Sequence, residues 1–194
     1  MKIVTPPNQI TSKRNVAMTT ISESEKRLHR CCFTGHRPQK MQISESKLKL
    51  LIEKAIVDAI QQGFVTFISG MAIGYDIIAA ETVLMLRKQY PHIHLICALP
   101  HPEFEKRWHK EWQCRYRRIL SQADLIKVVS PCYSLASYQR RNEWMVSKSS
   151  LVIAAYNGTP GGTRNTIEFA KMNHVPVHML DIPLGGIDNA RLHG

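Results

Sequence analysis

The residues best suited to hold a phosphorylated ligand are glycines, hydroxyl groups and cations gathered in short turns. In the turn over residues 158–163, Gly161, Gly162 and Thr163 come directly before an expected helix. Free backbone N–H groups at a helix amino end, and the partial positive charge there, attract anions. Thr163 adds a side-chain donor, so this turn predicts a phosphate cradle.

A second turn reads TGHRP over residues 34–38 and follows an apolar run. We expect Thr34 and Gly35 to bring the backbone close to a ligand, and His36 and Arg37 to offer donors and positive charge to an anion. The alternative is a tight turn with solvated charges. Its position after an expected strand favours ligand contact.

A third turn over residues 69–76 holds Ser69, Gly70, Gly74 and Asp76. It has neither the G-x-G-x-x-G pattern nor the lysine of a P-loop. Its glycines still free the backbone at the start of an apolar helix. Asp76 either caps this helix or accepts a hydrogen bond from a ribose hydroxyl, and the sequence leaves both roles open.

The segment Arg140, Arg141 and Asn142 opens a further expected helix. An arginine there can form charge-assisted bonds to phosphate, and Asn142 can contact a base or ribose edge. The alternative is a solvated basic helix start. The helix dipole disfavours cations at that end, which tips the interpretation toward ligand binding.

An aromatic stripe marks an expected helix over residues 103–121. Phe104, Trp108, Trp112 and Tyr116 recur at i+4 spacing, interleaved with lysines and arginines. Such a stripe can stack single-stranded nucleic acid, but packing against a sheet explains the spacing without a ligand, and we favour packing. His92 and His94 have no cysteine or carboxylate partners at metal-ligand spacing, so we predict no metal and no cofactor.

These turns need strands and helices to bring them together. Apolar runs near residues 31–33, 64–68, 93–99, 125–129, 151–156 and 175–180 predict strands, and amphipathic stretches predict helices near 48–60, 76–88, 103–121, 137–148 and 163–172. Regular alternation predicts an α/β, Rossmann-like three-layer α/β/α sandwich with a mainly parallel sheet. Ligands bind such sheets at the carboxyl ends of the strands, where all these turns fall.

The chain has 194 residues, of which 44% are hydrophobic and 21% charged, as in an ordinary globular domain. Residues 1–28 are polar without a hydrophobic period, and we expect a flexible tail followed by a single domain over 29–194. No signal-peptide core or long apolar run occurs, so we expect a cytoplasmic protein with no membrane contact. The five cysteines form no C-x-x-C pair, and we expect them to be reduced.

The net charge of +11 would ordinarily favour a nucleic-acid partner. Residues 1–30 hold six basic and two acidic side chains, which leaves +7 for the rest of the chain. A mildly basic domain of this kind could equally steer a small phosphorylated ligand into a cleft.

The series TGHRP, SGMAIGYD, Arg141-Asn142 and Gly161-Gly162-Thr163 resembles the SLOG superfamily, which unites DNA-processing protein A with the Lonely-guy proteins. The TGHRP opening is most similar to the small YspA/YpsA-like SLOG family of unknown function. The resemblance covers residues 29–182. It implies a Rossmann-like fold that binds nucleotides or nucleotide-derived ligands.

The resemblance also carries an enzymatic alternative. Lonely-guy proteins hydrolyse nucleoside 5′-monophosphates with a P-G-G-x-G-T-x-x-E motif, to which Pro160, Gly161, Gly162 and Glu168 correspond, whereas Arg164 and Asn165 stand at the later glycine and threonine. If the chain is active, the resemblance implies that Glu168 stabilises charge on the ribose and that Arg141 fixes the phosphate or base.

We therefore expect a binding protein or sensor for a nucleotide or nucleotide-derived small molecule. A phosphoribohydrolase is one alternative, and a single-stranded nucleic-acid-binding module is another. Nucleic acid is the less favoured partner. Apolar helix faces make a homodimer a further expectation.

Overall fold

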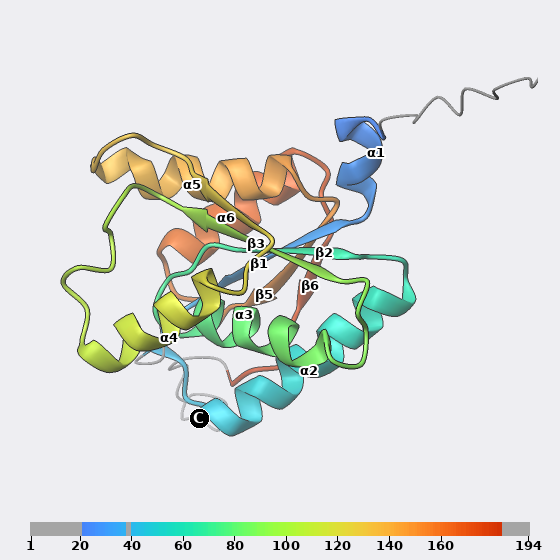
Figure 1. Ribbon diagram of the computed structural model, residues 1–194, viewed down its shortest axis with the longest axis horizontal. Coiled ribbons are helices and arrows are strands. Elements are labelled where there is room, and N and C mark those ends of the chain that lie inside the picture. Colours follow the sequence, from blue (N-terminus) through green and yellow to red (C-terminus); the bar gives the residue numbers. More distant parts are fainter. Residues whose placement is uncertain (1–20, 38–39, 184–194) are drawn as a thin grey trace, which may run out of the picture.

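The computed structural model describes residues 21–37 and 40–183, in which strands and helices alternate along the chain (Figure 1). The strands are β1 (Arg30–Gly35), β2 (Thr66–Ser69), β3 (His94–Leu99), β4 (Leu125–Val128), β5 (Leu151–Ala155) and β6 (Val177–Met179). The helices are α1 (Glu23–Leu28), α2 (Glu45–Gln61), α3 (Tyr75–Leu86), α4 (Lys110–Leu120), α5 (Leu135–Ser147) and α6 (Gly162–Met172).

The six strands form one sheet in the order β4-β3-β2-β1-β5-β6, and all neighbouring pairs are parallel. The chain builds outward from β1 to β4 and then crosses back to place β5 on the other side of β1. Strand order therefore reverses between β1 and β5, which is where such sheets open a crevice for ligands.

Helices cover both faces of the sheet: α2, α3 and α4 lie on one face, and α5 and α6 lie on the other (Figure 1). Successive residues of a strand point to opposite faces, so Phe33 and Phe67 join the first core while Cys32 and Ile68 join the second. The predicted three-layer α/β/α sandwich with a parallel sheet is confirmed.

Strand β4 is the exception to this double cover. Leu125, Ile126 and Val128 are all exposed, although continuous apolar strands are typical of sheet interiors. β4 is an edge strand, paired only with β3 in the described sheet.

The predicted helix over residues 103–121 begins only at Lys110, so the prediction was wrong for its first turns. Residues 104–107 form turns, and His109 has an extended backbone with a ψ of 146°, so a continuous helix can start only after it. The aromatic stripe still packs as core: the rings of Phe104, Trp108 and Tyr116 approach one another edge to face, with centroids 4.9–5.5 Å apart. The packing interpretation of this stripe is confirmed.

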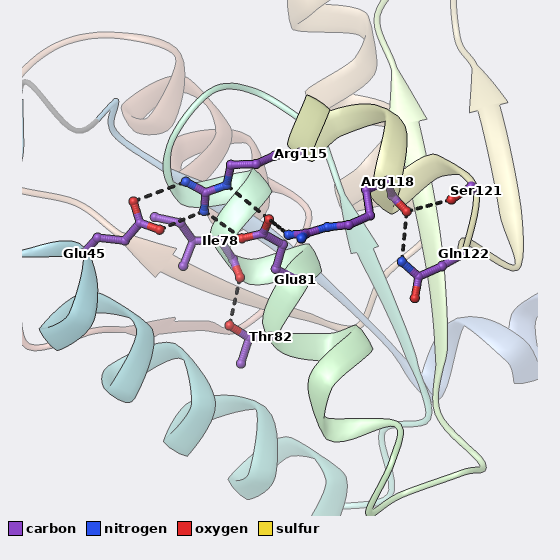
Figure 2. A network of polar contacts seen from close by, with 8 residues as sticks. All are labelled: Glu45, Ile78, Glu81, Thr82, Arg115, Arg118, Ser121 and Gln122. Atoms are coloured by element: carbon purple, nitrogen blue, oxygen red, sulfur yellow. Dashed lines mark hydrogen bonds and ion pairs between the residues drawn. The ribbon is translucent and has the colours of Figure 1, made fainter. Parts of the chain in front are cut away.

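Helix α4 is fastened to its neighbours by charged side chains (Figure 2). Arg115 donates to both carboxylate oxygens of Glu81 on α3, at 3.1 and 2.6 Å, and to Glu45 on α2 at 2.8 Å. Arg118 also donates to Glu81, at 2.8 Å. Two of the basic residues in the stripe thus hold three helices together.

The predicted tail over residues 1–28 divides into two parts. Residues 1–20 lie outside the described residues, as do 184–194 of the predicted domain. Residues 23–28 form α1, contrary to the prediction, because Ser22 and Glu25 make a reciprocal capping box. Helix α1 buries none of its residues, so no hydrophobic period signalled it. Within the described ranges, none of the helices has the length and apolar character required to cross a bilayer.

Candidate functional site

A cavity of about 400 Å³ opens at the carboxyl ends of β1 and β5, where the strand order reverses. Most of the residues predicted for the site surround it. The lining consists of Phe33, Thr34, Gly35, His36, Arg37, Lys40, Ala72, Asp76, Tyr138, Arg141, Asn142, Gly161, Gly162 and Thr163. The sheet topology thus brings together three turns and helix α5, which are far apart in the sequence. The prediction that Arg140, Arg141 and Asn142 open this helix was wrong, because α5 begins at Leu135 and Arg141 lies in its second turn.

The predicted phosphate cradle lies at the amino end of α6. Gly161 is the residue before the helix and has a φ of 146°, which L side chains rarely adopt. Beyond Gly162 the cavity is open, because a Cβ placed there would meet only Asn142 Nδ2, at 3.8 Å. The first N–H groups of α6 are therefore accessible to an anion in the cavity.

Arg141 lies across the cavity from this turn and is only 5% exposed. Its Nη1 donates to the Gly70 carbonyl, and its Nε donates to Asn142 Oδ1 at 2.8 Å. Within the described residues, its Nη2 has no hydrogen-bond acceptor. Arg141 is thus a buried, oriented cation with donor capacity left for a ligand.

Gly70 makes room for Arg141 without lining the cavity itself. A Cβ at this position would lie 2.4 Å from Arg141 Nη1 and 2.7 Å from Asp76 Oδ2. A side chain there would therefore displace the cation. The requirement for glycine comes from packing against Arg141, whereas the sequence suggested that this glycine frees the backbone at the start of the helix.

Asp76 lines the cavity beside Arg141, with 4.0 Å between its Oδ2 and Arg141 Nη1. Burial raises the pKa of Asp76 to about 6, against the opposing effects of Arg141 and of the Ala72 N–H, which donates to Oδ2. Gly74, not Asp76, is the cap of α3. Of the two roles that the sequence left open, the capping role was wrong.

His36 is almost fully buried, and its ring stacks obliquely on Tyr156. Burial and the nearby Lys40 lower the pKa of His36 below its ordinary value. The imidazole is therefore mainly neutral near pH 7 and provides a donor or acceptor, not the positive charge that the sequence suggested. Its Nε2 lies 3.4 Å from Thr159 Oγ1.

Gly35 lines the cavity, and packing also requires a glycine at this position. A Cβ at Gly35 would lie 2.3 Å from Tyr75 Cγ, so the ring can pack against β1 only because this residue is glycine. Tyr75 extends beneath the strand, and its hydroxyl donates to the Ile153 carbonyl at 3.1 Å. This contact fixes the start of α3 below the cavity.

Four predicted residues besides Gly70 lie outside the lining. Ser69 shapes its own turn, accepting from the Met71 N–H and donating to the Asp76 carbonyl, and Gly74 caps α3 with a φ of 92°. Arg140 donates to Ser134 Oγ at 2.7 Å. Glu168 is on an exposed part of α6 and accepts from Arg164 Nε at 2.7 Å.

Sequence reasoning missed Lys40 and Tyr138, which both line the cavity. Lys40 Nζ donates to the Pro160 carbonyl at 3.4 Å, next to the glycine turn. Tyr138 precedes Arg141 by three residues, so the two share a face of α5. This helical spacing was the signal that could have identified Tyr138.

The cavity carries net positive charge. Arg37, Lys40 and Arg141 are cations, and Asp76 is the single carboxylate among the described lining residues. Two helix amino ends, those of α3 and α6, add partial positive charge. Within residues 21–37 and 40–183, no three His, Cys, Asp or Glu side chains gather as a metal site would require.

The family model described as "YspA SLOG family" matches residues 31–182, which cover the elements from β1 to β6 except for Arg30, the first residue of β1. The uncharacterised SPbeta prophage-derived protein YoqJ of Bacillus subtilis is 34% identical over 143 residues, covering 68% of this chain and 82% of that protein. The UPF0398 protein BH1768 of Halalkalibacterium halodurans is 30% identical over 127 residues, covering 64% of this chain and 67% of that protein.

Two solved structures share the fold. DNA processing protein A from Helicobacter pylori, described for its mode of single-stranded DNA binding, aligns with a TM-score of 0.54 at 18% identity and 81% coverage of this chain. DNA processing protein A from Streptococcus pneumoniae aligns with a TM-score of 0.56 at 17% identity and 84% coverage. The chain spans 66% of the first protein and 52% of the second.

Proposed function

This chain belongs to the YspA SLOG family, and we propose that its cavity binds a nucleotide or nucleotide-derived ligand through the ligand's phosphate groups. One observation carries the proposal. The open amino end of α6 and the buried, partly unpartnered guanidinium of Arg141 line the same cavity, at the point where the strand order reverses.

Each part of the cavity suits one part of a nucleotide. The N–H groups at Gly162 and Thr163, with Arg141, suit a phosphate. Asp76 suits a ribose hydroxyl, because a carboxyl oxygen can accept a hydrogen bond in either protonation state. Asn142 suits the edge of a base or ribose, although its Oδ1 already accepts from Arg141.

Neighbouring arginines on α5 provide a matched test of the phosphate site. Arg141 lines the cavity, whereas Arg140 points to Ser134 outside it. We expect ADP-ribose, used as a probe with phosphates and one base, to bind the wild-type chain in isothermal titration calorimetry. Arg141→Met should weaken binding by at least about tenfold, because a charge-assisted hydrogen bond to phosphate is lost.

Arg140→Met should leave the affinity within about twofold of wild type, since Arg140 is exposed and does not line the cavity. Thermal unfolding of both variants checks that the fold survives. The proposal fails if neither ADP-ribose nor AMP binds, or if both arginine variants bind as the wild type does.

Hydrolysis of the bound nucleotide is not part of this proposal. The glutamate that the Lonely-guy resemblance assigned to catalysis, Glu168, lies outside the cavity and is paired with Arg164. Incubation of AMP with the protein, with free adenine measured by chromatography, decides the enzymatic alternative. Release of adenine that disappears in Glu168→Ala would reinstate it.

A further inference from the structure

A second and larger cavity, of about 730 Å³, lies beside the first, at the carboxyl ends of β3 and β4. Its walls come from the segment before α4 and from the turn between β4 and α5. The lining consists of His101, Pro102, Glu103, Phe104, Lys106, Arg107, Trp108, Pro131, Cys132, Tyr133 and Tyr138. Both cavities have volumes within the range of about 300–1,000 Å³ typical of small-molecule sites.

The second cavity is rich in aromatic rings arranged around His101. The rings of Phe104, Tyr133 and Tyr138 stand nearly perpendicular to the imidazole, with centroids 5.3–6.0 Å from it. His101 Nδ1 donates to the Pro102 carbonyl at 2.8 Å, which holds the imidazole in place. The cavity is therefore lined by oriented rings on a fixed support.

Two of these rings remain open to a ligand. Tyr133 is 63% exposed and Tyr138 is 38% exposed, whereas Phe104 is buried. An exposed aromatic ring in a cavity offers a face on which a planar base can stack, and every nucleobase has such a face. These tyrosines suit a nucleobase better than an aliphatic ligand.

The rim of the second cavity is basic. Glu103 pairs with Lys106 at 2.7 Å, so the two charges offset each other. Arg107 has no ion-pair partner among the described residues. A cation beside exposed aromatic rings suits a nucleotide, because the cation can pair with the phosphate while the ring stacks on the base.

Tyr138 joins the two cavities, because it lines both of them. One turn of α5 therefore presents Tyr138 to both cavities and Arg141 to the phosphate cavity. A ligand held at Arg141 can thus extend past Tyr138 into the aromatic cavity.

We propose that the aromatic cavity binds a second nucleobase, so that the ligand carries two nucleobases joined through phosphate groups. This inference rests on the proposed function, because the phosphates occupy the cavity around Arg141. The shared chemistry is that of a free dinucleotide or of two successive nucleotides in a single strand.

Two probes isolate the second base. Diadenosine diphosphate has the pyrophosphate, riboses and first adenine of ADP-ribose and adds a second adenine. We expect it to bind the wild-type chain at least about tenfold more tightly than ADP-ribose, since one stacked base contributes a factor of that order. Calorimetry on the full-length protein measures both affinities.

Tyr133→Ala should remove this advantage and leave ADP-ribose affinity unchanged, whereas Tyr133→Phe should keep both affinities. Tyr133 lies on an exposed turn, so its loss should not unfold the chain. Leu135→Ala is the matched control, because Leu135 is 87% exposed and lines neither cavity. A separate readout is the rate at which Cys132, which lines the aromatic cavity, is alkylated. The measurement uses Cys114→Ser protein, because Cys114 is also exposed, and diadenosine diphosphate should slow the reaction.

The outcomes separate the two proposals. Equal affinity for the two probes, unaffected by Tyr133→Ala, overturns the second-base site and leaves the phosphate site standing. If Tyr133→Ala weakens the binding of ADP-ribose and of diadenosine diphosphate equally, the second-base site is also overturned. The single adenine of ADP-ribose would then be the base in the aromatic cavity. Binding of neither probe overturns both proposals.

A third probe distinguishes the sources of the ligand. Octadenylate that binds no tighter than diadenosine diphosphate supports a free dinucleotide. Octadenylate that binds at least about tenfold tighter, with the advantage lost in Tyr133→Ala, supports a single strand.

Discussion

Asp76 and Arg141 give the phosphate cavity a charge that depends on pH. Because burial raises the pKa of Asp76 to about 6, the carboxyl is mostly protonated at pH 5 and mostly ionised at pH 7. Ionisation adds a negative charge near the proposed phosphate position. At a partly screened site, this charge makes the binding free energy of an anion less favourable by about 1 kcal/mol. Affinity for ADP-ribose, whose pyrophosphate does not titrate in this range, should therefore fall roughly fivefold from pH 5 to pH 7.

Calorimetry at pH 5, 6 and 7 measures this slope, and Asp76→Asn should flatten it. His36 acts in the same direction, since its lowered pKa lets it gain a proton only toward acidic pH. Any slope left in Asp76→Asn therefore belongs to His36, and His36→Asn should remove that remainder. An affinity that rises with pH would contradict this account of the pair.

At the scale of elements, the position of α4 depends on Arg115. This guanidinium has a side chain only 15% exposed and joins α4 to Glu81 of α3 and Glu45 of α2 (Figure 2). Arg115→Met leaves the partly buried Glu81 with only Arg118 as a partner. We expect the free energy of unfolding to fall by about 1–3 kcal/mol, which corresponds to several degrees in the melting temperature.

Arg117→Met on the same helix is the control, because within residues 21–37 and 40–183 the Arg117 side chain donates only to Gln113 Oε1, at 3.4 Å. It should change stability by less than about 0.5 kcal/mol. Thermal and urea unfolding measure both variants. Equal stability of Arg115→Met and the wild type would show that packing of Tyr116 and Ile119 alone holds α4.

The helices that sequence predicted well are those whose apolar period coincides with burial. In α2 the period over Leu48, Ile52 and Ile56 is the buried face itself. The aromatic period over residues 103–121 predicted too long a helix. Phe104 and Trp108 pack against Tyr116 of α4, but they do so from non-helical turns. Helix α1 depends on a local capping box and gave no periodic signal.

The site was predictable where its residues lie in turns at strand ends, as at Gly161 and Arg37. It was not predictable where a long-range contact defines the role. Gly70 is required by Arg141, which is 71 residues away in the chain, and Lys40 reaches the glycine turn across 120 residues. Local spacing contains no information about such contacts.

At the scale of the whole molecule, the parallel topology concentrates function at one edge of the sheet. β1 and β5 place their carboxyl ends beside the phosphate cavity, and β3 and β4 place theirs beside the aromatic cavity. The helices beneath them supply positive amino ends to the same edge. Two adjoining cavities are thus a consequence of strand order together with the loops that follow each strand.

The net charge of +11 does not by itself direct this molecule to long nucleic acids, because a net charge does not say whether the cations gather on one face. The phosphate cavity presents three cations, those of Arg37, Lys40 and Arg141. If these are the phosphate contacts, octadenylate affinity should fall by only about 10- to 20-fold between 50 and 200 mM salt, because each contact to a single strand contributes a slope of about −0.7. Fluorescence anisotropy of labelled octadenylate measures this dependence. A loss of about a thousandfold or more would require about seven or more contacts. It would therefore mean that the strand follows a basic surface extending well beyond the two cavities.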